Sequence, residues 1–200
     1  MDEDKTVNIQ DILMGRRTVA LVGEINHKST DEVAQRLLRL QDESQERINL
    51  VIDSGGGENR AALHLCDLLG TVMTAPVRGI AFGSCMSAAT FILLHCSERV
   101  STPYTEFLIH SGRTSGISIT VNDKTADELQ LLADESKANR EEMVRLYMAK
   151  LKLPRKRVDQ LVTQGDQRFN RTLNAVQALE IGLIQKIITE NLGIFPKPPA

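Results

Sequence analysis

The chain has few of the residues that would indicate a disulfide scaffold, a metal site or a nucleic-acid surface. It contains no Trp, only 4% aromatic residues, three Cys, and 24 basic against 26 acidic residues. The thiols of Cys66, Cys85 and Cys96 are odd in number and have no metal-ligand spacing, so we expect free cysteines in a reducing compartment. The net charge of −2, with both signs interspersed, lacks the concentrated basic face that phosphate backbones require. We therefore expect no bound metal and no nucleic-acid partner.

Long hydrophobic runs are also missing. No apolar stretch approaches the ~20 residues of a membrane-spanning helix, and the acidic start at residues 1–4 has neither segment of a signal peptide. We expect a cytoplasmic protein that does not bind membranes. Hydrophobic residues make up 42% of the 200 residues, which is enough for one core. The only basic run, residues 152–157, is typical of a solvated helix start.

Strand-like and helix-like apolar patterns alternate along the first 110 residues. Strands are expected at residues 18–22, 48–52, 77–80 and 107–109. A helix is expected at residues 29–40, with a capping box of Ser29 and Glu32, and further helices follow residues 57 and 87. This alternation predicts the α/β class, with a mostly parallel sheet and helices packed on it.

The rest of the chain is expected to be mainly helical. A long charged helix at about residues 124–151 carries a partial apolar stripe of Leu129, Leu132, Met143, Leu146 and Tyr147. Because such a helix extends beyond a small domain, we expect its stripe to meet another subunit or element. Shorter helices at residues 155–164 and 174–182 and a closing strand at 183–188 follow. We expect one domain over residues 18–190, between a short N-terminal segment, 1–17, and a flexible tail, 191–200.

Three groups are candidates for chemistry, and each follows a predicted strand. Ser87 lies among small residues at the start of an apolar helix, where backbone N–H groups stabilise an oxyanion. His110 ends the strand at residues 107–109 and is the natural base for a nucleophile. A glycine triplet spans residues 55–57. Because ligands gather at the carboxyl ends of parallel strands, we expect these groups at one edge of the sheet.

Each candidate also has a plainer interpretation. Ser87 alone is typical of a small residue at a helix start. His110 alone is typical of a histidine at a strand end whose ring nitrogens have hydrogen-bond partners, rather than of a catalytic base. Cys85 is the rival nucleophile, but a buried apolar cysteine is the simpler interpretation. His95 is the rival base, yet it lies about two turns along the same helix, roughly 12 Å from Ser87 by helix rise.

The glycine triplet is compatible with a phosphate cradle or with an oxyanion and substrate-binding loop. It lacks the Gly-Lys-Ser ending of a P-loop and the spaced glycines of a dinucleotide site, so a nucleotide site is not expected. The two remaining histidines, His27 and His64, have no motif around them, and we expect structural roles for both.

These segments resemble the proteolytic subunit of the Clp protease family. That family carries an Asn-Ser-Pro-Gly-Gly turn, a Gly-x-Ala-Ala-Ser-Met-Gly-Ala-Phe-Leu-Leu nucleophile segment and a Met-Ile-His-Gln-Pro segment. This chain has Asp-Ser-Gly-Gly-Gly at residues 53–57, Gly-Ser-Cys-Met-Ser-Ala-Ala-Thr-Phe-Ile-Leu at 83–93 and Leu-Ile-His-Ser-Gly at 108–112. The order and spacing agree over nearly the whole length, including the Ala-Leu-Glu-Ile-Gly-Leu-Ile ending at 178–184.

The resemblance implies a crotonase-like (ClpP-type) spiral of repeated β-β-α units, with a protruding handle helix that pairs two heptameric rings into a tetradecameric chamber. It also implies a serine endopeptidase with Ser87 as nucleophile, His110 as base, and the N–H groups of Gly56 or Gly57 and of Ala88 as oxyanion hole. An AAA+ unfoldase would use ATP to feed unfolded polypeptides into the chamber, so no cofactor is expected in this chain.

The chain also departs from the family pattern. The family's catalytic Asp falls on Asn170, whose amide accepts a bond from an imidazole but cannot offset the imidazolium charge. Asp166, one helical turn earlier, is an alternative acid. The ring-linking Asp-Arg pair corresponds to Arg-Phe at residues 168–169, and the proline of the glycine turn is missing. We therefore expect a triad of Ser87, His110 and Asn170 with low intrinsic activity.

Two further functions stay open at this point. The chain is alternatively a structural subunit that completes a mixed ring with an active paralogue, since both the acid and the ring-linking pair are altered. A crotonase-type acyl-thioester enzyme on the same fold is the third alternative. That class needs oxyanion N–H groups and carboxylate bases but no Ser–His pair.

Overall fold

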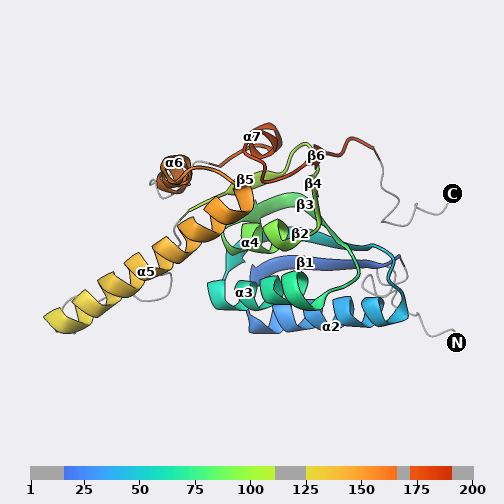
Figure 1. Cartoon of the computed structure of the whole chain (residues 1–200), viewed down its shortest axis with the longest axis horizontal. Coiled ribbons are helices and arrows are strands. Elements are labelled where there is room, and N and C mark those ends of the chain that lie inside the picture. The colour runs from blue at the N-terminus through green and yellow to red at the C-terminus, as the bar shows by residue number, and fades with distance from the viewer. Residues whose placement is uncertain (1–15, 111–124, 166–171, 191–200) are drawn as a thin grey trace, which may run out of the picture. The chain divides into compact units, whose positions relative to one another are not determined.

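The structure is a computed structural model that describes residues 16–110, 125–165 and 172–190 (Figure 1). The chain divides into two compact units, a larger one of residues 1–107 with 173–200 and a smaller one of residues 108–172. The expectation of one domain over residues 18–190 stays a prediction beside this division. The tail at 191–200 and nearly all of the segment 1–17 lie outside the described residues.

The larger unit is built on a parallel sheet. Its strands run in the order β1 (Thr18–Ile25), β2 (Ile48–Gly57), β3 (Val77–Met86), β4 (Glu98–Ser101) and β6 (Lys186–Ile187), and each neighbouring pair is parallel. A further strand, β5 (Glu106–Leu108), follows β4, and its Phe107 exchanges two backbone hydrogen bonds with Leu173. The α/β class and the parallel sheet are as predicted.

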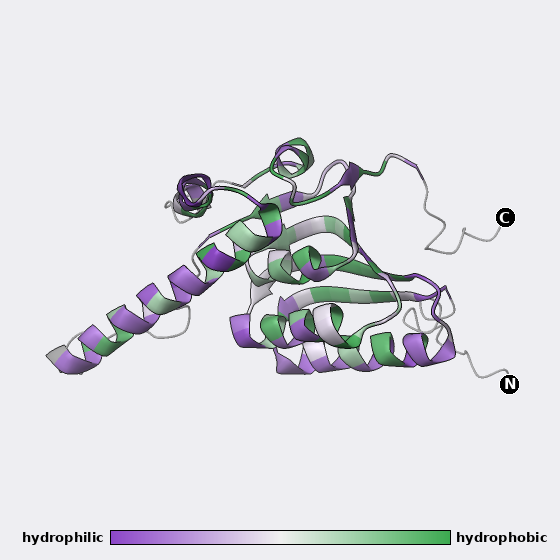
Figure 2. Ribbon diagram, in the orientation of Figure 1, coloured by the Kyte–Doolittle hydropathy of each residue, from purple (hydrophilic) through white to green (hydrophobic). Residues whose placement is uncertain are grey.

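Helices form a layer on this sheet. The helix α2 (His27–Glu43) packs on β1, α4 (Ala88–His95) packs on β2 and β3, and α3 (Asn59–Asp67) packs against both α2 and α4. Figure 2 shows that α2 is hydrophilic on its outward side, whereas every residue of α4 from 88 to 94 is buried. A helix that is apolar all round belongs in a core. A short π-helical turn, η1 (Leu68–Val72), follows α3, and α7 (Ala175–Glu180) precedes β6.

The capping box predicted for Ser29 and Glu32 is wrong. The helix α2 begins earlier, because Asn26 is its N-cap and accepts a hydrogen bond from the Ser29 N–H at 3.0 Å. The Ser29 hydroxyl in turn accepts the Asn26 N–H at 3.0 Å. Ser29 therefore fills the third helical position of the box rather than its first.

The strands differ from their predicted bounds for local reasons. Both β2 and β3 have ten residues and extend beyond the predicted 48–52 and 77–80. The glycine triplet, which we expected in a loop after the strand, is the end of β2, where Gly57 pairs with Ile25 of β1. The strand β4 was not predicted, because its Glu-Arg-Val-Ser sequence has one apolar residue. The closing strand β6 covers only two of the predicted residues 183–188.

The smaller unit is a helical pair. The helix α5 (Ala126–Leu151) agrees with the predicted long helix, and α6 (Arg155–Gly165) agrees with the predicted short one. They pack against each other, with ion pairs between Arg155 and Glu141 and between Arg140 and Asp159, the latter at 3.8 Å. The first half of α5 is largely exposed, and its Leu131 side chain is 61% exposed. No helix among the described residues is long and apolar enough to cross a membrane.

Candidate active site

Ser87 has a backbone conformation that L residues rarely adopt. It lies between β3 and α4 with φ +53° and ψ −126°, outside the regions that non-glycine residues favour. Its carbonyl accepts hydrogen bonds from the Thr90 N–H at 2.9 Å and the Thr90 hydroxyl at 2.7 Å, which fix the turn into the helix. A strained strand-to-helix turn of this kind presents a nucleophile beside the N–H groups of a helix N-terminus.

The end of β2 lies directly against this turn. Gly56 has φ +102°, and a Cβ atom on it would come within 2.7 Å of the Ser87 Cβ and 2.9 Å of the Met86 carbonyl oxygen. Such distances are far below van der Waals contact, so only glycine fits at this position. A Cβ atom on Gly56 would also lie 3.3 Å from the Ala88 nitrogen. The structure therefore brings together three of the predicted site residues, namely Gly56, Ser87 and Ala88.

Gly57 is constrained by the neighbouring strand. It has φ +152°, and a Cβ atom there would lie 2.1 Å from the Ile25 carbonyl oxygen. The Gly56 N–H donates to the Ser54 hydroxyl at 3.0 Å, and that hydroxyl donates to the Gly23 carbonyl at 2.5 Å. The Gly56 amide thus has a partner within the chain. Sequence reasoning missed Ser54, although its position directly before the triplet was a usable signal.

The rival nucleophile and the rival base both have other roles. Cys85 is fully buried, and this burial raises the pKa of its thiol far above the usual range, with smaller contributions from Cys96 and Asp53. A thiol held in that state is inert at neutral pH. The Nδ1 atom of His95 lies 2.8 Å from the Phe91 carbonyl oxygen and must carry the proton of that bond, because a carbonyl only accepts.

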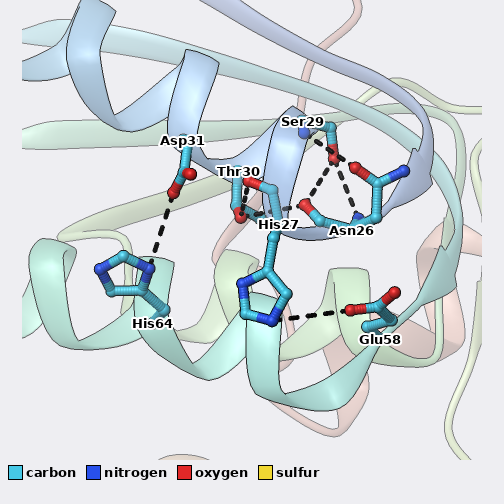
Figure 3. A network of polar contacts seen from close by, with 7 residues as sticks. All are labelled: Asn26, His27, Ser29, Thr30, Asp31, Glu58 and His64. Carbon is cyan, nitrogen blue, oxygen red and sulfur yellow. Dashed lines mark hydrogen bonds and ion pairs between the residues drawn. The ribbon is translucent and has the colours of Figure 1, made fainter.

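The two remaining histidines join helices at the surface (Figure 3). His27 Nε2 lies 3.7 Å from Glu58, at the start of α3, and His64 Nδ1 lies 3.8 Å from Asp31 of α2. Both imidazoles are largely exposed, and exposed ion pairs contribute little to stability. The structural roles expected for both histidines stay a prediction. Among the described residues, no group of three or more His, Cys, Asp or Glu is arranged to hold a metal ion.

The comparison with known families decides the assignment. Residues 1–191 match the model of the family described as Clp protease. The chain belongs to the Clp protease family. It is 31% identical to the ATP-dependent Clp protease proteolytic subunit 2 of Treponema denticola, over 98% of this chain and 96% of that protein. It is 27% identical to subunit 1 of Rhodopirellula baltica, over 92% of this chain and 77% of that protein.

The solved structures agree with this assignment. A ClpP1 variant from Listeria monocytogenes, which carries one Asn-to-Asp substitution, matches with a TM-score of 0.74 over 94% of this chain and all of that chain. Because the two sequences are only 24% identical, this structural match shows the fold alone. The predicted ClpP-type fold of the Clp protease family is thereby confirmed.

Of the remaining predicted site residues, the structure describes His110. His110 lies two residues after the end of β5 and is half-buried. It belongs to the smaller unit, whereas Ser87 belongs to the larger one. Asn170, the alternative acid Asp166 and the pair at residues 168–169 lie outside the described residues. The triad of Ser87, His110 and Asn170 in this Clp protease family member stays a prediction.

Proposed function

We propose that the chain is a serine endopeptidase subunit of an ATP-dependent Clp-type protease, which cleaves unfolded polypeptides inside an oligomeric chamber. The observation that carries this proposal is the strained Ser87 turn at the start of α4, with the backbone of Gly56 packed against it. Strain of this kind is maintained only where the surrounding structure holds it, and it gathers at active sites. Membership of the Clp protease family supplies the reaction class.

The mechanism follows from the proposed roles. The Ser87 hydroxyl attacks the peptide carbonyl while His110 takes its proton, and His110 then gives that proton to the leaving amine. Water hydrolyses the acyl-enzyme by the same route. The Gly56 N–H is already donated to Ser54, so we assign the oxyanion to the N–H groups of Gly57 and Ala88.

Asn170 is proposed to orient the imidazole without the charge of an aspartate. In a serine protease, the Asp-to-Asn change at this position lowers kcat about 10⁴-fold. We therefore infer a peptidase of low intrinsic turnover. Replacing the alternative acid, Asp166→Asn, should leave that turnover unchanged if Asn170 is the third member.

The partners are proposed from the family. An AAA+ unfoldase would dock on rings of this chain and spend ATP, so the chain itself needs no cofactor, and we place the assembly in the cytoplasm. The relatives include proteins named subunit 1, subunit 2 and subunit 3. Such names favour several paralogous subunits, so the rings are either heptamers of this chain or mixed rings.

A second candidate is a structural subunit that completes a mixed ring with an active paralogue. Asn170 in place of the expected acid is the observation that favours it. A crotonase-type acyl-thioester enzyme receives no support, because the family that matches is the Clp protease family.

A serine-directed fluorophosphonate probe tests the proposal. We expect it to label the wild-type assembly at Ser87, and we expect the label to disappear in Ser87→Ala. Ser97→Ala is the matched control, because it removes a more exposed serine hydroxyl of the same unit. If Ser87 is not labelled alone or after co-assembly with an active paralogue, the endopeptidase proposal is wrong and the structural subunit is supported.

A further inference from the structure

The sheet loses its regular register on both sides of Asp53 and Ser54. Between β1 and β2, the pairing shifts after Val22, so that Gly23 faces two residues of β2. Between β2 and β3, Ile52 pairs with Ala81 and Ser54 with Cys85, so residues 82–84 bulge against Asp53 alone. Bulges leave backbone groups outside the ladder and redirect the chain near active sites.

The Ser54 side chain bridges the first of these irregularities. It is 2% exposed, donates to the Gly23 carbonyl at 2.5 Å and accepts the Gly56 N–H at 3.0 Å. One hydroxyl thus ties Gly23 of β1 to the glycine segment of β2. Gly56 is the residue whose backbone packs against Ser87.

The Asp53 side chain holds the second irregularity. Its Oδ1 atom accepts the Ser84 N–H at 2.9 Å. The preceding residue, Gly83, has φ +64°, and a Cβ atom there would come within 2.8 Å of the same Oδ1. The carboxylate therefore lies against the bulge of β3, a few residues before Ser87.

We propose that Asp53 and Ser54 are positioning residues for the proposed active site. Ser54 sets the path of the glycine segment, and Asp53 sets the path of the segment that leads to Ser87. These are the two sides of the contact between Gly56 and Ser87. Neither side chain needs to touch the substrate. The inference rests on the proposed endopeptidase function for its effect on turnover, but not for its effect on structure.

The kinetic consequence is a loss of kcat. A displacement of about 1 Å at a catalytic group costs on the order of 10²-fold. We expect Ser54→Ala to lower the kcat for a fluorogenic peptide by about 10- to 100-fold, with KM within about 3-fold of wild type. We expect Asp53→Ala to act similarly and Asp53→Asn to recover most of the loss, because the amide oxygen keeps the acceptor for the Ser84 N–H.

Ser101→Ala is the matched control. Ser101 is 0% exposed, and its hydroxyl donates to the Thr102 carbonyl at 2.6 Å. The substitution therefore removes a buried serine hydroxyl of the same unit, but on β4 and without a bond to a glycine amide. We expect its kcat to stay near that of wild type. Mass measurement of each assembly shows whether the variants fold and assemble alike.

Amide hydrogen exchange supplies a measurement that does not need activity. We expect the Gly56 amide to exchange faster in Ser54→Ala, and the Ser84 amide to exchange faster in Asp53→Ala, with neither change in Ser101→Ala. Unchanged exchange at these amides would overturn the positioning proposal, as would a kcat for Ser54→Ala equal to that of Ser101→Ala. If the wild type is inactive and unlabelled, the proposed function fails, and the exchange measurement alone then decides the positioning proposal.

Discussion

The backbone of Gly56 and the side chain of Ser87 lie in direct contact, so that a Cβ atom on Gly56 would be 2.7 Å from the Ser87 Cβ. This contact joins the end of β2 to the turn before α4, two segments that are far apart in the sequence. It gives Gly56 a function other than flexibility. The backbone at Gly56 must approach the nucleophile closely, and a side chain at this position would block that approach.

Gly56→Ala should therefore abolish peptide hydrolysis, with a loss of more than about 10²-fold in kcat. The added methyl group would displace the Ser87 turn, and the positive φ would add strain of about 1–3 kcal/mol. Gly55→Ala is the control, because a Cβ atom there meets nothing within 4 Å. Equal activity in the two alanine variants would show that the contact does not position Ser87.

Asn170→Asp should raise kcat. A carboxylate stabilises the imidazolium that His110 becomes when it takes the Ser87 proton, whereas an amide only orients the ring. We expect a gain of at least about 10-fold, within the roughly 10⁴-fold that the opposite change costs in a serine protease. The measurement is hydrolysis of a short fluorogenic peptide by both proteins at one assembly state. No gain would mean that residue 170 does not face the imidazole.

The buried thiols should make the fold sensitive to alkaline pH. Burial raises the pKa of Cys96 to about 12 and that of Cys85 further still. A thiol of the unfolded chain has a pKa of about 8.5. Below that pH both states keep their protons and the stability is fully present. Above it the unfolded chain loses protons that the folded chain retains, so the free energy of unfolding falls as pH rises toward 12.

Urea unfolding between pH 7.5 and pH 10 measures this effect. We expect the free energy of unfolding to fall by on the order of 1 kcal/mol per pH unit for each thiol. The control is the double variant Cys85→Ala and Cys96→Ala, in which that part of the slope should be absent. Identical slopes in the two proteins would show that the thiols do not differ between the folded and unfolded states.

Much of the fold can be predicted from the spacing of apolar residues and from the residues that begin and end helices. The helix α5 was predicted almost to the residue, because its charged pattern is long and unbroken. The start of α2 was predicted wrongly, because Asn26, Ser29 and Glu32 all suit a capping box and the local sequence does not select between them. The strand β4 has too few apolar residues to be seen locally and is held by pairing with β3.

Only part of the candidate site could be predicted from the sequence. The small residues around Ser87 identify the nucleophile segment, but its φ of +53° is imposed by packing and has no local signal. The roles of Asp53 and Ser54 depend on bulges in two neighbouring strands, and register shifts of this kind cannot be seen in one strand's sequence. Gly56 was predicted as a possible amide donor, and only the structure shows that its N–H is taken by Ser54.

The exposed start of α5 should carry the pairing of rings. Leu131 is 61% exposed on this helix, and we expect it to contact another subunit when two rings pair through α5. Leu131→Asp should shift a paired double ring toward single rings in native mass measurements. Ala133→Asp adds the same charge at another exposed position of the helix and should leave the double ring in place. Equal dissociation of both variants would contradict a role for Leu131.

The most direct test of the account is hydrolysis of a short fluorogenic peptide by the purified full-length chain, with Ser87→Ala alongside and the assembly state measured by mass. We predict slow hydrolysis by the wild type and none by Ser87→Ala, because the strained Ser87 turn is the proposed source of the nucleophile. Hydrolysis that persists at the same rate in Ser87→Ala would contradict this account.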